Sequence, residues 1–105
     1  MAISQEVRMK RREPTTNLQD GGRNPYSVNE SRYGFGARDG DRIVLVHVSD
    51  LALDALEPSA DRRSNYLGIL MRHRGSIFEG AKRLYRDGRV EPSDVIFVKA
   101  GDIRG

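Results

Sequence analysis

The sequence contains no cysteine among its 105 residues. A disulfide scaffold, a thiolate metal site and a cysteine nucleophile are therefore excluded. Tryptophan is also absent and aromatic residues make up only 7% of the chain, which indicates a modest hydrophobic core. The longest aliphatic run, residues 43–46, falls far short of the roughly 20 residues that a membrane-spanning helix needs. The first seven residues lack the apolar region of a secretory signal, so we expect a cytoplasmic protein without membrane partners.

Positive and negative side chains nearly balance, with 18 basic and 15 acidic residues and a net charge of +3. The length suits one compact domain. Basic residues concentrate in two zones, residues 1–24 and 62–89. Such zones either attract an anionic partner or keep a surface soluble, and the second interpretation is favoured.

Residues 1–25 are predicted to form a flexible polar and basic tail, because glycine, proline and isolated apolar residues follow no period there. Residues 26–105 are predicted to form a single α+β domain. Within it, residues 31–37 alternate bulky side chains with glycine, which is typical of a strand. The Asp39–Gly40 pair then predicts a hairpin turn that leads into a second strand at 42–48.

Two helices and a third strand are predicted next. Ser49 or Asp50 can cap a short helix over residues 51–57, and Pro58 ends it. A single long helix is predicted from Ser59 to Asp87, with a bend near Gly75 and a closing Gly88. A third strand is expected at 95–98. The apolar stripe of the long helix consists of Tyr66, Leu67, Leu70, Ile77, Ala81, Leu84 and Tyr85.

The order strand, strand, helix, helix, strand predicts a small two-layer α+β sandwich. We expect its sheet to be largely antiparallel, with helices on one face. Residues 43–48 and 95–98 are apolar on both faces of their strands. The face without helices would then expose apolar side chains to water, and such a surface favours association with a second copy of the chain.

Residues 73–90, HRGSIFEGAKRLYRDGRV, followed by a strand and AGDI, resemble the bacterial domain-of-unknown-function family numbered 1488. The resemblance extends over about residues 24–103. It implies a small α/β domain and supplies no catalytic residue. The positions that match the family's pattern are Arg74, Ile77, Ala81, Tyr85, Ala100 and Asp102.

No catalytic or metal-binding constellation is visible. His47 and His73 are the candidates for a general base or ligand, but a metal needs three or four ligands close together, and structural roles are favoured for both. Asp39 and Asp41 fit turn chemistry. We therefore predict no catalytic residue, no metal and no cofactor.

The basic helix is expected to carry its cations opposite the apolar stripe. The candidate binding face consists of Arg72, Lys82, Arg83 and Arg86. Glu79 is spaced to pair with Lys82 and Arg83. Arg74 points near the stripe and could anchor to Asp102 or to a backbone carbonyl. The predicted structural anchors are therefore His73, Arg74 and Asp102.

Three functions remain open from the sequence. The favoured one is a non-enzymatic domain that binds another macromolecule, either a protein partner or a second copy of itself. The alternative is weak, non-specific nucleic-acid binding through the tail and the basic helix face. The third is a small enzyme that uses His47 or His73.

Overall fold

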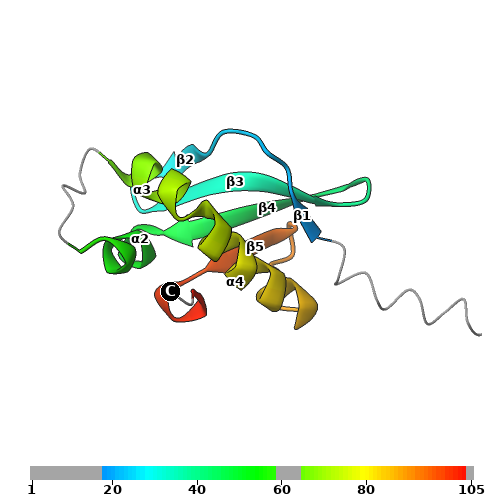
Figure 1. Ribbon diagram of the computed structural model, residues 1–105. Helices are drawn as coiled ribbons and strands as arrows, with labels where there is room; N and C mark the ends of the chain where they lie inside the picture. Colours follow the sequence, from blue (N-terminus) through cyan, green and yellow to red (C-terminus); the bar gives the residue numbers. More distant parts are fainter. Residues whose placement is uncertain (1–17, 59–64, 104–105) are drawn as a thin grey trace, which may run out of the picture.

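The computed structural model describes residues 18–58 and 65–103, and the predicted α+β class is confirmed. Within these residues the helices lie on one side of a five-stranded sheet (Figure 1). The strands are β1 (Leu18–Asp20), β2 (Tyr26–Asn29), β3 (Arg32–Asp39), β4 (Arg42–Ser49) and β5 (Val95–Val98). The helices are α2 (Asp50–Leu56), α3 (Tyr66–Arg72), α4 (Arg74–Arg86) and the 3₁₀ turn η3 (Ala100–Asp102).

The sheet has the order β1-β3-β4-β5, and β2 also pairs with β3. All pairs are antiparallel except β4 with β5. A parallel pair needs a long crossover, and α2, α3 and α4 provide it between these two strands. The prediction of a largely antiparallel sheet with one helical layer is therefore confirmed.

The predicted hairpin forms β3 and β4. Asp39 and Arg42 are the last partners in its register, and Gly40 has a φ of 65°. A side chain with a Cβ rarely adopts this left-handed conformation, so glycine is the residue that suits the turn. The third strand, β5, also lies at the predicted residues.

Helix α2 begins as its sequence indicates. The Ser49 side chain caps it by accepting a 3.0 Å hydrogen bond from the backbone N–H of Ala52. This bond satisfies one of the N–H groups that have no partner within the helix. The helix is closed at Glu57, directly before Pro58, as predicted.

The prediction of one continuous helix from Ser59 to Asp87 is wrong. Residues 59–64 lie outside the described residues, and the remainder is divided into α3 and α4 at His73. His73 leaves the helical conformation with φ −113° and ψ 15°. Its N–H donates to the carbonyls of both Ile69 and Leu70. The apolar period runs through both segments, so it could not reveal the break, which falls two residues before Gly75.

The tail prediction fails for part of its range. Residues 1–17 lie outside the described residues, but Leu18–Asp20 forms strand β1 against the end of β3. Leu18 is buried in the core with an exposed fraction of 4%. A three-residue strand is too short to produce a periodic signal, and contacts with the rest of the domain stabilise it.

The core lies between the sheet and the helices. Val44, Val46 and Val48 of β4 are fully buried there. Ile69 and Leu70 of α3 belong to the same cluster. The apolar stripe was predicted correctly except for Leu67, which is exposed, whereas Ile69 was not included in it. This difference follows from the changed direction of the chain at the helix break.

Candidate functional site

The predicted basic face does not form one open surface. Arg72 lies on α3, whereas Lys82, Arg83 and Arg86 lie on α4. Lys82 pairs with Glu79 at 3.2 Å, as predicted. Arg83 instead donates to the backbone carbonyl of Asp102 at 2.8 Å.

Arg86 differs from these neighbours. It is exposed, and no ion pair joins it to another residue within 18–58 or 65–103. Most of the predicted cations therefore bind groups of the protein itself. This arrangement leaves few of them for an outside anion, and nucleic-acid binding through this face stays a prediction.

Arg74 is an anchor, as predicted, but its partner is neither Asp102 nor a backbone carbonyl. Its guanidinium donates two hydrogen bonds to the Asp20 carboxylate, at 2.8 and 2.7 Å, and lies 4.3 Å from the centre of the Phe35 ring. Arg74 lowers the pKa of Asp20 by these hydrogen bonds. The sequence interpretation missed the pair because it assigned Asp20 to the tail.

Asp102 has a local role. Its carboxylate accepts a 3.0 Å hydrogen bond from the backbone N–H of Lys99. Its backbone carbonyl approaches α4 so closely that a Cβ at Gly80 would lie 2.5 Å from the oxygen. Glycine at this position therefore allows the 3₁₀ turn to pack against the helix.

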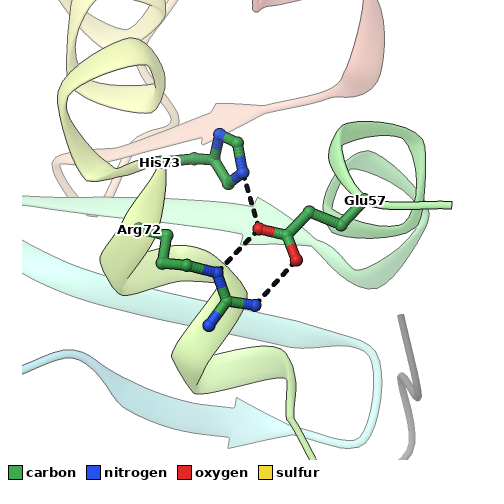
Figure 2. Close-up of polar contacts among 3 residues, drawn as sticks. All are labelled: Glu57, Arg72 and His73. Carbon is green, nitrogen blue, oxygen red and sulfur yellow. Dashed lines mark hydrogen bonds and ion pairs between the residues drawn. The ribbon is translucent and has the colours of Figure 1, made fainter. Parts of the chain in front are cut away.

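His73, the third predicted anchor, takes part in a cluster with Glu57 and Arg72 (Figure 2). Arg72 donates two hydrogen bonds to the Glu57 carboxylate, at 2.8 and 2.7 Å. The Nε2 atom of His73 lies 2.8 Å from the same carboxylate. Arg72, with a smaller contribution from His73, lowers the pKa of Glu57 to about 2. The cluster joins the end of α2 to the break between α3 and α4, which indicates a structural role.

The open face of the sheet, opposite the helices, is where side chains remain available for contact. We define the open face as the residues of β3, β4 and β5 that lie on the side of the sheet away from the helices, together with Tyr26 of β2. Its β4 residues are Ile43, Leu45 and His47, and Ile43 has an exposed fraction of 63%. Its β3 partners include Gly34 and Gly36. The complete set also contains Arg32, Arg38, Val95 and Phe97.

His47 is the buried polar residue of this face. Its ring lies edge-on to Tyr26 with centroids 6.4 Å apart, and its Nδ1 is 3.4 Å from a guanidinium nitrogen of Arg32. Burial, with the adjacent Arg32, lowers the pKa of His47. Its Nε2 has no hydrogen-bond partner among the described residues. A Cβ at Gly34 would lie 2.7 Å from the ring, so this glycine makes room for the histidine.

Arg32 covers the outer edge of the open face. Its guanidinium lies 4.0 Å from the centre of the Phe97 ring, a cation–π arrangement, and 3.9 Å from the Glu91 carboxylate.

In the described parts of the chain, no three His, Asp or Glu side chains lie close enough together to hold a metal ion. None of the helices described is long and apolar enough to cross a membrane.

No family model matches the sequence. No curated protein matches it either. A solved structure does match: the crystal structure of a protein of unknown function from the DUF1488 family of Shewanella loihica PV-4, with a TM-score of 0.67. The chain has the fold of this DUF1488 protein. The two share 17% sequence identity, and the match covers 78% of this chain and 91% of the DUF1488 chain. The predicted resemblance is thus confirmed in the fold.

Proposed function

We propose that the chain is a non-enzymatic cytoplasmic domain that acts by binding a protein through the open face, with a second copy of itself as the partner. The observation that carries this proposal is the exposed Ile43 within an apolar strip that none of the helices described within 18–58 and 65–103 covers. Removing such a strip from water is favourable at about 25 cal/mol per Å² of apolar surface. The lack of cysteine is in keeping with a reducing compartment.

The charges beside Ile43 support self-association. Arg38 on β3 is the register partner of Ile43. Asp41, at the hairpin end, precedes Ile43 by two residues. A two-fold contact brings the same patch of both copies together. Arg38 of one copy can then approach Asp41 of the other, so that the ends of the apolar strip carry complementary charges.

Light scattering on size-exclusion fractions over a range of protein concentrations tests the proposal. We expect the parent protein to form a dimer and Ile43→Asp to be monomeric, because the substitution places a carboxylate in the contact. Leu51→Asp is the matched control, since Leu51 is equally apolar and 71% exposed but lies on α2, on the helical side. Circular dichroism checks that both variants are folded.

Two results would contradict the proposal. One is a parent protein that remains monomeric at every concentration. The other is a dimer that Leu51→Asp disrupts as much as Ile43→Asp does, because the contact would then not lie on the open face.

A further inference from the structure

A groove of about 500 Å³ lies between the open face and the segment that joins β1 to β2. Figure 1 shows this segment as an arch beside β3. Arg23 of the arch and Tyr26 at the start of β2 form one wall of the groove. Ile43 and Leu45 of β4 form the opposite wall, and Gly36 and Arg38 of β3 lie between them.

The floor of the groove is bare backbone at Gly36. A Cβ built at this glycine meets no atom within 4 Å, so the space above it is unfilled. The arch is held close to the floor because the Gly21 N–H donates a 3.0 Å hydrogen bond to the Gly36 carbonyl. A Cβ at Gly21 would lie 2.9 Å from that carbonyl oxygen. The groove therefore has a fixed entrance and an interior with room for a ligand.

The groove combines apolar walls with two guanidinium groups. Arg23 and Arg38 approach from the arch and from β3, and neither forms an ion pair with another residue of the described ranges. Two nearby carboxylates are already engaged, and Asp41 at the hairpin end does not line the groove. Asp20 accepts two hydrogen bonds from Arg74, and Asp39 accepts one from the Tyr85 hydroxyl. The groove consequently presents positive charge beside apolar surface.

We propose that this groove binds a small carboxylic acid with an apolar body. The aliphatic walls accept the body, and the guanidinium groups bind the carboxylate, for which their paired N–H donors are well suited. The volume lies within the range of ordinary ligand pockets. The site is complete within one chain, but it shares Ile43 and Arg38 with the proposed dimer contact, so the acid and a second copy would compete for this face.

Titration of the full chain with octanoate, followed by amide chemical shifts in two-dimensional NMR, tests the site. A small ligand in an open groove is expected to bind with a Kd on the order of 1 mM. The shifts should centre on Gly36, Ile43 and Leu45. Acetate and octylammonium are the matched probes, because the first lacks the apolar body and the second reverses the charge. Both are expected to bind at least tenfold more weakly.

Each other outcome overturns the inference. Equal binding of acetate would show an ion site only, and equal binding of octylammonium would show an apolar contact only. No shift with octanoate, or shifts centred on the helical side, would exclude the groove as the site. Because the groove and the proposed dimer contact share Ile43 and Arg38, the titration is made at a protein concentration at which light scattering shows the parent protein to be monomeric. A failure of octanoate binding is then distinct from a failure of the dimer.

Two substitutions locate the ligand. Gly36→Val should abolish octanoate binding, because its side chain fills the groove, while valine favours a strand and leaves the fold intact. Gly75→Ala on α4 is the control, since its Cβ also meets no atom within 4 Å, and it should bind as the parent does. Arg38→Gln should weaken octanoate binding roughly three- to tenfold. Octylammonium binding should strengthen instead, because the substitution removes a positive charge that repels it. Octanoate binding that survives Gly36→Val in a folded protein would refute the site.

Discussion

The two faces of strand β4 have the same kind of sequence and opposite environments. Val44, Val46 and Val48 point toward the helices and are fully buried. Ile43 and Leu45 alternate with them on the open face, where Ile43 is largely exposed. Apolar residues on one face build the core, and apolar residues on the other are available to a partner. The comparison shows that hydrophobicity alone does not distinguish a core position from an exposed one.

The open face differs from the covered face in its polar groups as well. It contains His47, Arg32 and the two glycines opposite β4, whereas the buried residues on the covered side of β4 are three valines. Glycine at Gly34 is explained by the histidine ring, but glycine at Gly36 faces empty space. The first glycine makes room for a neighbouring side chain, and the second leaves the groove above β3 open.

The largest effect is expected from matched isoleucines on the two faces. Ile96 on β5 is fully buried on the helical side, whereas Ile43 is 63% exposed. Ile96→Ala should lower the free energy of unfolding by about 2–5 kcal/mol, because it removes buried contacts and leaves a cavity. Ile43→Ala should lower it by less than about 1 kcal/mol. Urea denaturation measures both at a protein concentration where the parent is monomeric, and equal losses would remove the distinction between the faces.

An intermediate effect is expected at the ion pair that holds β1 to α4. Arg74→Ala should lower the free energy of unfolding by about 1–3 kcal/mol, because it leaves the Asp20 carboxylate without its partner. The folded-state pKa of Asp20 lies below its ordinary value of 3.8. The stabilisation by Asp20 is therefore present above 3.8 and is lost as the pH falls through the lower folded value.

The same pair can be checked by its pH dependence. The difference in the free energy of unfolding between the parent and Arg74→Ala should become smaller in acid. Urea denaturation at several pH values measures it. Arg86→Ala, an exposed position on the same helix, is the control and should have little effect. A difference that stays constant in acid would assign the role of Arg74 to its contact with Phe35 alone.

The smallest effect is expected at the half-buried cluster of Figure 2. Glu57→Gln should lower the melting temperature slightly, because it removes the charge that Arg72 and His73 bind. The pKa of Glu57 is lowered from 4.5 to about 2, so its contribution is complete above 4.5 and vanishes as the pH falls through about 2. Thermal scans across this window should show the two proteins converging. Glu79→Gln is the control. Equal melting temperatures of the parent and Glu57→Gln at neutral pH would contradict the pairing of Glu57 with Arg72 and His73.

Local sequence determined the elements whose signals are contained in a few neighbouring residues. The Asp39–Gly40 turn, the Ser49 cap and the closing Gly88, which has a φ of 78°, all form where the sequence places them. Such positions are predictable because turn and cap geometry depends on the conformations that one residue can adopt. The two-residue period of a strand places Ile43, Leu45 and His47 on one face of β4, but with apolar residues on both faces the sequence does not tell which face the helices cover.

The tertiary structure alone decided the helix break, strand β1 and the partners of the charged residues. His73 interrupts a stripe whose period continues on both sides, and Leu18 has no apolar neighbour in sequence to mark it as buried. Arg74 and Asp20 lie 54 positions apart along the chain, and Arg72 and Glu57 lie 15 apart. Spacing in the sequence predicts contacts only within one helix or one hairpin. Partners that meet across the domain depend on how the helices pack on the sheet, which is a property of the whole chain.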